Sequence, residues 1–260
     1  MIKNKPHRVG RSEPRGVKSP RQPALDALRG LAILLMIVDH AAYYLWDVPL
    51  APHTIRIVTR LSMPLFCGLM GYFLAGRANI NWDRFYQLCL AVITINLAFF
   101  SVHHKLEILA SLLIAYILFI CCRNWLTFAV LAVYLAPWDP TLAWFDYPLP
   151  IVIACVAQGM MLRRFGVIAA LASGLLITLA AFVVPAPSVY VLFYVIPATW
   201  LIACAADHPQ LPLTSPPLKW LRLNLLGRNM LRLHWLAVLG RYPLTTYLAQ
   251  YYILFALTRW

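Results

Sequence analysis

The stretch ALDALRGLAILLMIVDHAAYYL, residues 24–45, decides how this chain is built. It is long and apolar enough to form a helix that crosses a bilayer, which takes about 20 residues. It nevertheless contains Asp26, Arg29, Asp39 and His40. A charged side chain in the hydrocarbon costs about 2.5–3.5 kcal/mol on insertion scales, so these groups need partners or a polar cavity. We therefore expect the polar side of this helix to face the interior of a bundle.

Arg29 and His40 share one face of the predicted helix. They are 11 residues apart, which at about 100° per residue is three turns plus about 20°. The rise per residue separates them by about 16 Å along the axis. Asp26 falls on the same face, one turn before Arg29. Asp39 points in another direction, because neighbouring helix residues do not face each other.

The composition is that of a membrane protein. Of the 260 residues, 62% are hydrophobic and 12% charged, and the mean hydropathy is +0.72, which excludes a soluble domain of this length. The net charge of +13 does not indicate nucleic-acid binding, because the basic residues lie in the N-terminal segment and between apolar runs. There they orient the protein and face anionic lipid or an anionic ligand. We expect no metal site and no structural disulfide among the six cysteines.

The chain divides into a basic tail and an all-α, polytopic transmembrane domain. Residues 1–23 are basic and proline-rich, and we expect them to be a disordered cytoplasmic tail. Residues 24–260 form the transmembrane helical domain, in which Gly68 and Gly71 are expected to permit close helix approach. The apolar runs predict about nine spans, at 24–45, 61–75, 85–101, 106–121, 125–136, 151–162, 167–184, 189–206 and 242–260.

The distribution of basic residues favours a cytoplasmic N-terminus. With nine spans in alternation, the outside keeps only Arg56, Arg60, Lys105 and Arg259, and the other basic residues, apart from Arg29 within the first span, lie inside. This agrees with the positive-inside rule. No internal repeat is visible, which weighs against an inverted-repeat transporter.

Two further groups extend the candidate site. A partner for His40 has to come from another helix, where Glu107, Asn96 or an aromatic hydroxyl can supply it. The basic segment 219–241 is interpreted either as an amphipathic surface segment held by anionic lipid or as a phosphate site for a cytosolic donor. Its last part, residues 233–239, is predicted to be interfacial or re-entrant.

The opening ALDALRGLAILLMIVDH, residues 24–40, resembles the first helix of the transmembrane acyltransferases, in which an Arg or Lys and a His are separated by ten residues. Acyltransferase 3 proteins and heparan-glucosaminide acetyltransferase-like proteins share this opening. RLSMPLFCGLMGYFLAGR, residues 60–77, followed by LEILASLLIAYIL at 106–118, looks like the pilin-acetylating TraX group. The ending GRYPLTTYLAQYYIL, residues 240–254, is similar to the closing helix of the heparan-glucosaminide-like branch. The resemblance covers the first four predicted spans and the last.

The resemblance implies an acyltransferase of the bacterial cytoplasmic (inner) membrane. Its donor would be acyl-CoA, most often acetyl-CoA, and its acceptor an extracytoplasmic hydroxyl or amine on an envelope glycan or a pilin-like peptide. Carried over, Arg29 positions the donor and His40 is the catalytic base, with Asp39 as a further candidate catalytic residue. The 16 Å between Arg29 and His40 is about the reach of a pantetheine arm. The implied donor-binding residues are Arg29, Asp26, Arg228 and Arg241.

Two other functions fit the polar helix. A permease or lipid flippase would use the polar face to carry a substrate or protons. A non-catalytic assembly protein would bury the same helix against a partner. The partners expected beside the bilayer are acyl-CoA, the glycan or pilin-type acceptor and, in a homo-oligomer, further copies of the chain.

Overall fold

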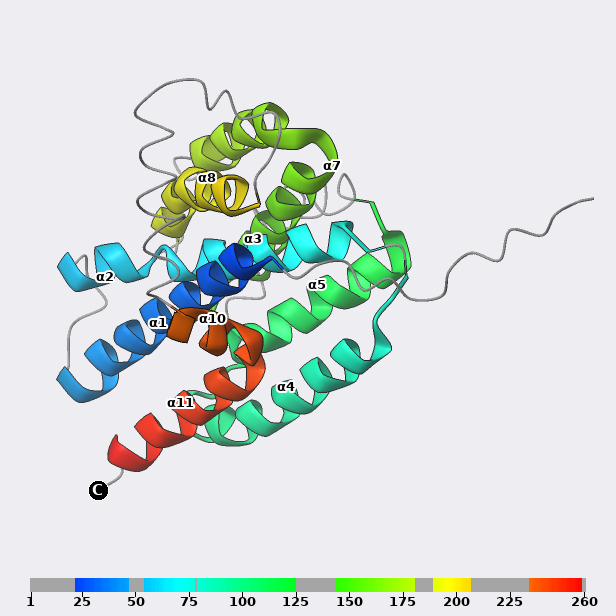
Figure 1. The fold of residues 1–260 in the computed structure, drawn as a ribbon. Coiled ribbons are helices and arrows are strands. Elements are labelled where there is room, and N and C mark those ends of the chain that lie inside the picture. Colours follow the sequence, from blue (N-terminus) through cyan, green and yellow to red (C-terminus); the bar gives the residue numbers. More distant parts are fainter. Residues whose placement is uncertain are drawn as a thin grey trace, which may run out of the picture.

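The structure, a computed structural model, describes residues 22–46, 54–77, 79–124, 144–180, 189–206 and 234–258. These residues form a helical bundle without a β-strand (Figure 1). The predicted all-α class is therefore confirmed for this part of the chain. In chain order the elements are α1 (Pro23–Trp46), α2 (Thr54–Thr59), α3 (Ser62–Ala75), α4 (Trp82–His103), α5 (Ile108–Cys122), α7 (Leu149–Ala180), the 3-10 helix η3 (Val189–Tyr194), α8 (Val195–Ala205), α10 (His234–Arg241) and α11 (Pro243–Thr258).

Three helical segments of the described residues are long and apolar enough to cross a membrane: Ile55–Ala75, Trp82–His103 and Leu149–Leu179. They support a membrane protein. Helix α1 has a comparable length of 24 residues but is not among these three segments. Helix α5 and the segment Val191–Ala205 are shorter apolar helices. The total of nine spans and the cytoplasmic N-terminus stay predictions.

Most predicted spans correspond to helices. The first four coincide with α1, α3, α4 and α5, and the last with α11. The eighth is divided between η3 and α8, and the predicted interfacial segment 233–239 is α10, which packs against α1. The tail, the fifth predicted span 125–136 and most of the basic segment 219–241 lie outside the described residues.

Helix α7 is broken at Gly166, between the sixth and seventh predicted spans. Gly166 has φ 86° and ψ −175°, a conformation that residues with a Cβ rarely adopt. The amide of Gln158 joins the two halves, because it donates to the carbonyl oxygen of Ala170 and accepts from the hydroxyl of Ser173. The sequence therefore folds this apolar stretch into two helices across a kink.

The outer face of α4 is the clearest candidate for lipid contact. Leu90, Ile93 and Leu97 are exposed at helical spacing, whereas Ala91 and Ile95 on the other face are buried in the main core. A helix that is apolar on its exposed side belongs in a membrane rather than in water.

The closest helix contacts depend on glycine. A Cβ on Gly71 of α3 would lie 1.9 Å from the carbonyl oxygen of Val156 on α7, and one on Gly68 would lie 2.9 Å from the Ile202 side chain of α8. A residue with a side chain at Gly71 would push α3 and α7 apart. The predicted role in close helix approach is confirmed for Gly71, whereas at Gly68 the contact is with the movable end of the Ile202 side chain.

Arginine side chains gather at one end of the bundle. Arg123, after α5, donates to the carbonyl oxygen of Arg77, after α3, at 3.5 Å. Arg164 donates to the carbonyl oxygen of Arg123 at 2.8 Å, and Arg163 donates to the hydroxyl of Tyr72 at 2.8 Å. Basic residues at one end are expected where that end faces the cytoplasm.

Candidate functional site

Arg29 lies at this arginine-rich end, where α1 meets α10. Its Nη1 donates to Oδ1 of Asp26 and to the backbone oxygen of Gly240, both at 3.0 Å. The guanidinium carbon lies 4.4 Å from the ring centroid of Phe73 on α3, within cation–π range. Neither hydrogen bond uses Nη2 or Nε, so the guanidinium is held in place from one side.

Gly240 brings α10 close enough to reach Arg29. A Cβ on Gly240 would lie 1.8 Å from the backbone oxygen of Asp26, so only glycine permits this approach. Because the helices are this close, the Gly240 carbonyl oxygen accepts a hydrogen bond from Arg29. The next residue, Arg241, lines the same pocket as Arg29.

A pocket of about 190 Å³ opens beside Arg29. Four arginines from different elements line it: Arg29, Arg77, Arg84 and Arg241, which we call the arginine mouth. Apart from Arg29, these side chains are exposed. Asp26 pairs with Arg29 and offsets one of the four charges. The arginine mouth therefore favours a ligand with several negative charges, since guanidinium groups bind phosphate oxygens in pairs.

The inner wall of the pocket is largely apolar. Helix α5 contributes Leu109, Leu112 and Tyr116, which share one helix face. From Tyr116 to Leu109 this face covers about 10 Å of the helix axis. Leu109 lies two residues after Glu107, at the start of α5. The pocket thus runs from the arginine mouth toward the end of the bundle that contains His40.

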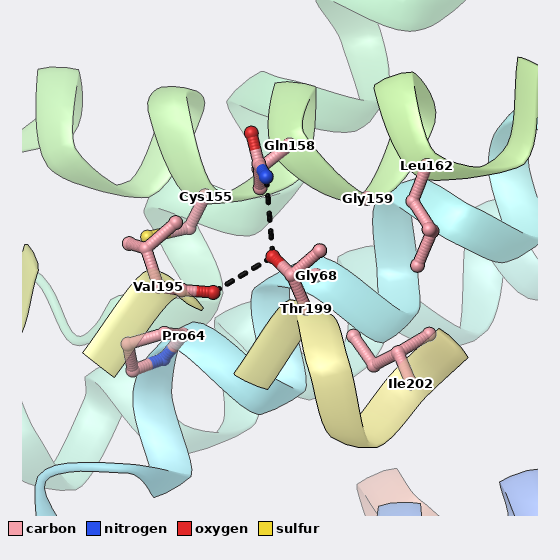
Figure 2. Close-up of a pocket in the computed structure, with 9 residues that line it drawn as sticks. All are labelled: Pro64, Gly68, Cys155, Gln158, Gly159, Leu162, Val195, Thr199 and Ile202. Atoms are coloured by element: carbon pink, nitrogen blue, oxygen red, sulfur yellow. Dashed lines mark hydrogen bonds between the residues drawn. The ribbon is translucent and has the colours of Figure 1, made fainter. Parts of the chain in front are cut away.

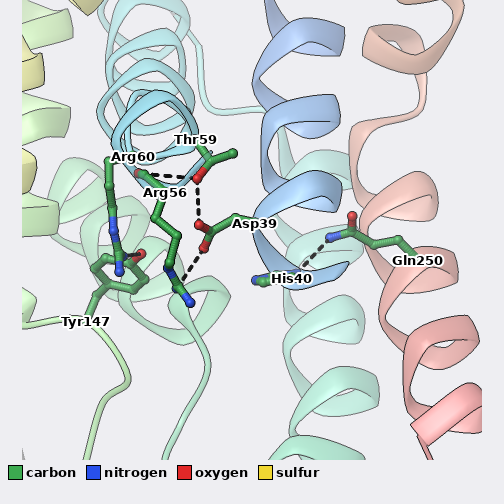
Figure 3. A network of polar contacts seen from close by, with 7 residues as sticks. All are labelled: Asp39, His40, Arg56, Thr59, Arg60, Tyr147 and Gln250. Carbon is green, nitrogen blue, oxygen red and sulfur yellow. Dashed lines mark hydrogen bonds and ion pairs between the residues drawn. The ribbon is translucent and has the colours of Figure 1, made fainter. Parts of the chain in front are cut away.

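His40 faces α11 in the interior of the bundle. Its Nδ1 lies 3.4 Å from Nε2 of Gln250 (Figure 3). Its ring makes edge contacts with Tyr44 and Tyr247, at centroid distances of 6.4 Å and 6.3 Å. The imidazole therefore has polar and aromatic neighbours, and its hydrogen-bond partner comes from another helix, as predicted.

A buried carboxylate lies next to Tyr247. The Tyr247 hydroxyl donates to Oε1 of Glu107, which is only 3% exposed, and the backbone N–H two residues further on donates to Oε2 at 2.8 Å. The backbone N–H of Glu107 donates to Oδ1 of Asn96 at 2.9 Å. Glu107 and Asn96 therefore bond to each other, and Gln250 rather than either of them is hydrogen-bonded to His40.

Asp39 is hydrogen-bonded to α2 rather than to His40. Its Oδ2 accepts from Nη2 of Arg56 at 3.2 Å, and its Oδ1 accepts from the Thr59 hydroxyl at 2.6 Å (Figure 3). All three side chains are buried. This pair joins α1 to α2 in the half of α1 that contains His40, as expected for adjacent helix residues that point in different directions.

Only some of the predicted donor-binding residues can be placed in one site. Arg29, Asp26 and Arg241 come together at the arginine mouth, whereas Arg228 lies outside the described residues. His40 does not line the pocket. It lies about 16 Å from Arg29 along α1, beyond the inner wall.

Three residues near these groups were absent from the predicted site. Arg77 and Arg84 were used only to orient the chain. They flank the short connection between two predicted spans, and that position places both at the end of the bundle where Arg29 lies. Gln250 is an amide within an apolar span, and intramembrane polar residues are a recognised signal of function.

A second cavity lies where α3, α7 and α8 meet (Figure 2). Its volume of about 10 Å³ suits at most one water molecule. Gln158 donates to the Thr199 hydroxyl at 3.1 Å, and Thr199 donates to the carbonyl oxygen of Val195 at 2.7 Å. We therefore assign it to packing. Within the described ranges, no cluster of three or more His, Cys, Asp or Glu side chains is placed to hold a metal ion.

Comparison with protein-family models, curated proteins and solved structures finds no match to this chain. Function is therefore inferred from the chain's own residues.

Proposed function

We propose that this chain is an integral-membrane acyltransferase that moves an acyl group, most often acetyl, from acyl-CoA to a hydroxyl or amine. One observation carries the proposal: arginines from four elements converge on a single pocket whose apolar wall runs toward His40. The resemblance of the first helix and of the last one to transmembrane acyltransferases points to the same chemistry.

The charge and the lining of the pocket suit the phosphates and the arm of coenzyme A. Coenzyme A carries its phosphates at one end and a long, thin pantetheine arm at the other. The arginine mouth would hold the phosphates, and the apolar wall formed by α5 would hold the arm. The distance of about 16 Å between Arg29 and His40 along α1 matches the length of that arm. The thioester would then lie at the end of the pocket nearest His40.

At the thioester, His40 would act as general base. The acceptor hydroxyl or amine gives a proton to the imidazole and attacks the thioester carbonyl carbon. The carbon–sulfur bond breaks, the acyl group stays on the acceptor, and the coenzyme A thiolate takes the proton from His40. A neutral imidazole suits this task, and such proton transfer typically contributes a factor of about 10²–10⁴ in rate.

The acceptor would come from the opposite end of the bundle. With a cytoplasmic arginine mouth, His40 is nearer the extracytoplasmic side of the bacterial inner membrane. We therefore propose an envelope glycan or a pilin-like peptide as acceptor. Asp39 would support the site structurally, since its buried hydrogen bonds with Arg56 and Thr59 join α1 to α2.

The test uses purified protein in nanodiscs with radiolabelled acetyl-CoA and an envelope extract. Release of coenzyme A and label in the extract are measured for the wild type and for His40→Asn. We expect His40→Asn to lose at least 10²-fold in rate. The matched control is His104→Asn, because His104 is exposed and has φ 53°, a conformation that Asn tolerates.

Two results would contradict the proposal. The first is transfer by His40→Asn at the wild-type rate. The second is uptake of a solute or lipid movement in proteoliposomes without release of coenzyme A, which would favour a permease or flippase. Mass spectrometry of envelope glycans and pilins from cells with and without the gene would identify the acceptor through a missing acetyl mass.

A further inference from the structure

Gln250 is the one side chain among the described residues that is hydrogen-bonded to His40. It is 6% exposed. Its Nε2 lies 3.4 Å from Nδ1 of His40, and its Oε1 has no hydrogen-bond partner in the described part of the chain. A buried amide oxygen without a partner is costly, at about 1–3 kcal/mol. Such an atom in a native structure calls for an explanation.

General-base chemistry at His40 supplies the explanation. A neutral imidazole has one N–H and one bare nitrogen, whereas an imidazole that has accepted a proton has an N–H at both positions. For Nε2 to be the bare nitrogen, Nδ1 must carry the N–H, and at this partly buried site Nδ1–H needs an acceptor. Rotation of the Gln250 amide by about 180° about its terminal torsion, which is soft, exchanges its donor for Oε1 at the same position.

We infer that Gln250 is a positioning residue that fixes the tautomer of His40 in which Nε2 is the base. With its amide turned so that Oε1 accepts from Nδ1–H, the neutral ring keeps Nε2 bare, and Nε2 takes the acceptor's proton while Nδ1–H stays bonded to Gln250. The inference rests on the proposed function, because only general-base catalysis requires a bare Nε2.

The other groups around His40 do not substitute for Gln250. The charges of Asp39 and Arg56 act on the imidazole, but these two side chains are paired with each other. Tyr44 and Tyr247 contact the ring by their edges. The Tyr247 hydroxyl donates to Glu107, and among the described residues its contact with His40 is an edge contact of the rings rather than a hydrogen bond.

The experiment compares Gln250→Met and Gln250→Glu in the nanodisc assay. Methionine keeps the volume but removes the acceptor, so kcat is expected to fall at least 10-fold while KM for acetyl-CoA changes less than 2-fold. Glutamate restores the acceptor, and its charge favours the protonated ring. Gln250→Glu should therefore recover kcat, and the acid limb of its pH–rate profile should move to higher pH by about one unit or more. The control is Thr245→Met, an exposed position on the same helix.

A second readout separates the inference from the proposed function. Nitrogen NMR of histidine-labelled protein reports which ring nitrogen carries the proton, with the His40 signal assigned by its loss in His40→Asn. We expect Gln250→Met to change the tautomer balance and Thr245→Met to leave it unchanged. If the wild type transfers acyl groups and Gln250→Met matches its kcat and pH profile, the inference fails and the proposed function stands. If the wild type transfers nothing, the proposed function fails, and an unchanged tautomer in Gln250→Met overturns the inference too.

Discussion

Substitution of Gly240 by alanine tests the link between helix packing and donor binding. The added Cβ would lie 1.8 Å from the Asp26 backbone oxygen, whereas ordinary contact begins at 3.4 Å. Helix α10 must therefore retreat by about 1.6 Å, the difference between the two distances. The Gly240 carbonyl would move beyond hydrogen-bond range of Arg29, and Arg241 would leave its position at the arginine mouth.

The expected result is loss of donor binding together with a modest loss of stability. Overpacking costs about 1–3 kcal/mol, and a displacement of this size in a positioned site can cost about 10²-fold in rate. We therefore expect Gly240→Ala to fold with a lower thermal unfolding temperature in detergent. Its kcat/KM for acetyl-CoA should fall by about 10²-fold, with most of the loss in KM.

The matched control is Gly76→Ala. There a Cβ would meet only the flexible guanidinium of Arg163, at 3.0 Å. Gly76 has φ −81°, so alanine fits the backbone, and both measurements should stay near wild type. Wild-type coenzyme A binding in Gly240→Ala would refute the assignment of the donor site to the α1–α10 contact.

Two further variants test charge. Arg84→Gln removes one member of the arginine mouth; we expect about a tenfold weaker affinity for coenzyme A at low salt and a smaller effect in 0.5 M salt, measured by calorimetry. Arg164→Gln, at the same end but not in the pocket lining, is its control, and equal losses in both variants would contradict the site. Asp39→Leu leaves Arg56 buried without its partner and should destabilise the protein by about 3–5 kcal/mol. The double variant Asp39→Leu with Arg56→Met should recover much of that loss in thermal unfolding, and no recovery would argue against a paired role.

Local signals were sufficient for much of the fold. Apolar runs bounded by charges gave α1, α3, α4 and α5 within a few residues, because a helix in a membrane follows hydropathy closely. The close helix approach at Gly71 was predicted from a glycine within an apolar run. The break at Gly166 followed from the adjacent arginines, since charges mark the ends of apolar helices.

Side-chain partners were harder to predict, since they depend on tertiary packing. Nothing in the sequence shows that α10 packs against α1 and that the Gly240 carbonyl oxygen accepts a hydrogen bond from Arg29. For the same reason, Gln250 could not be paired with His40, nor Glu107 with Tyr247, before the helices were placed. Residues 210 positions apart, as His40 and Gln250 are, share no local pattern.

The most direct measurement of the central claim is affinity labelling with bromoacetyl-CoA. The arginine mouth would hold its phosphates, and the reactive carbon would lie at the far end of the pantetheine arm. Peptide mass spectrometry of the labelled protein should find the alkyl group on His40, and excess coenzyme A should prevent it. Labelling elsewhere with His40 unmodified, or labelling of His40 that coenzyme A does not suppress, would contradict the claim that one donor reaches from Arg29 to His40.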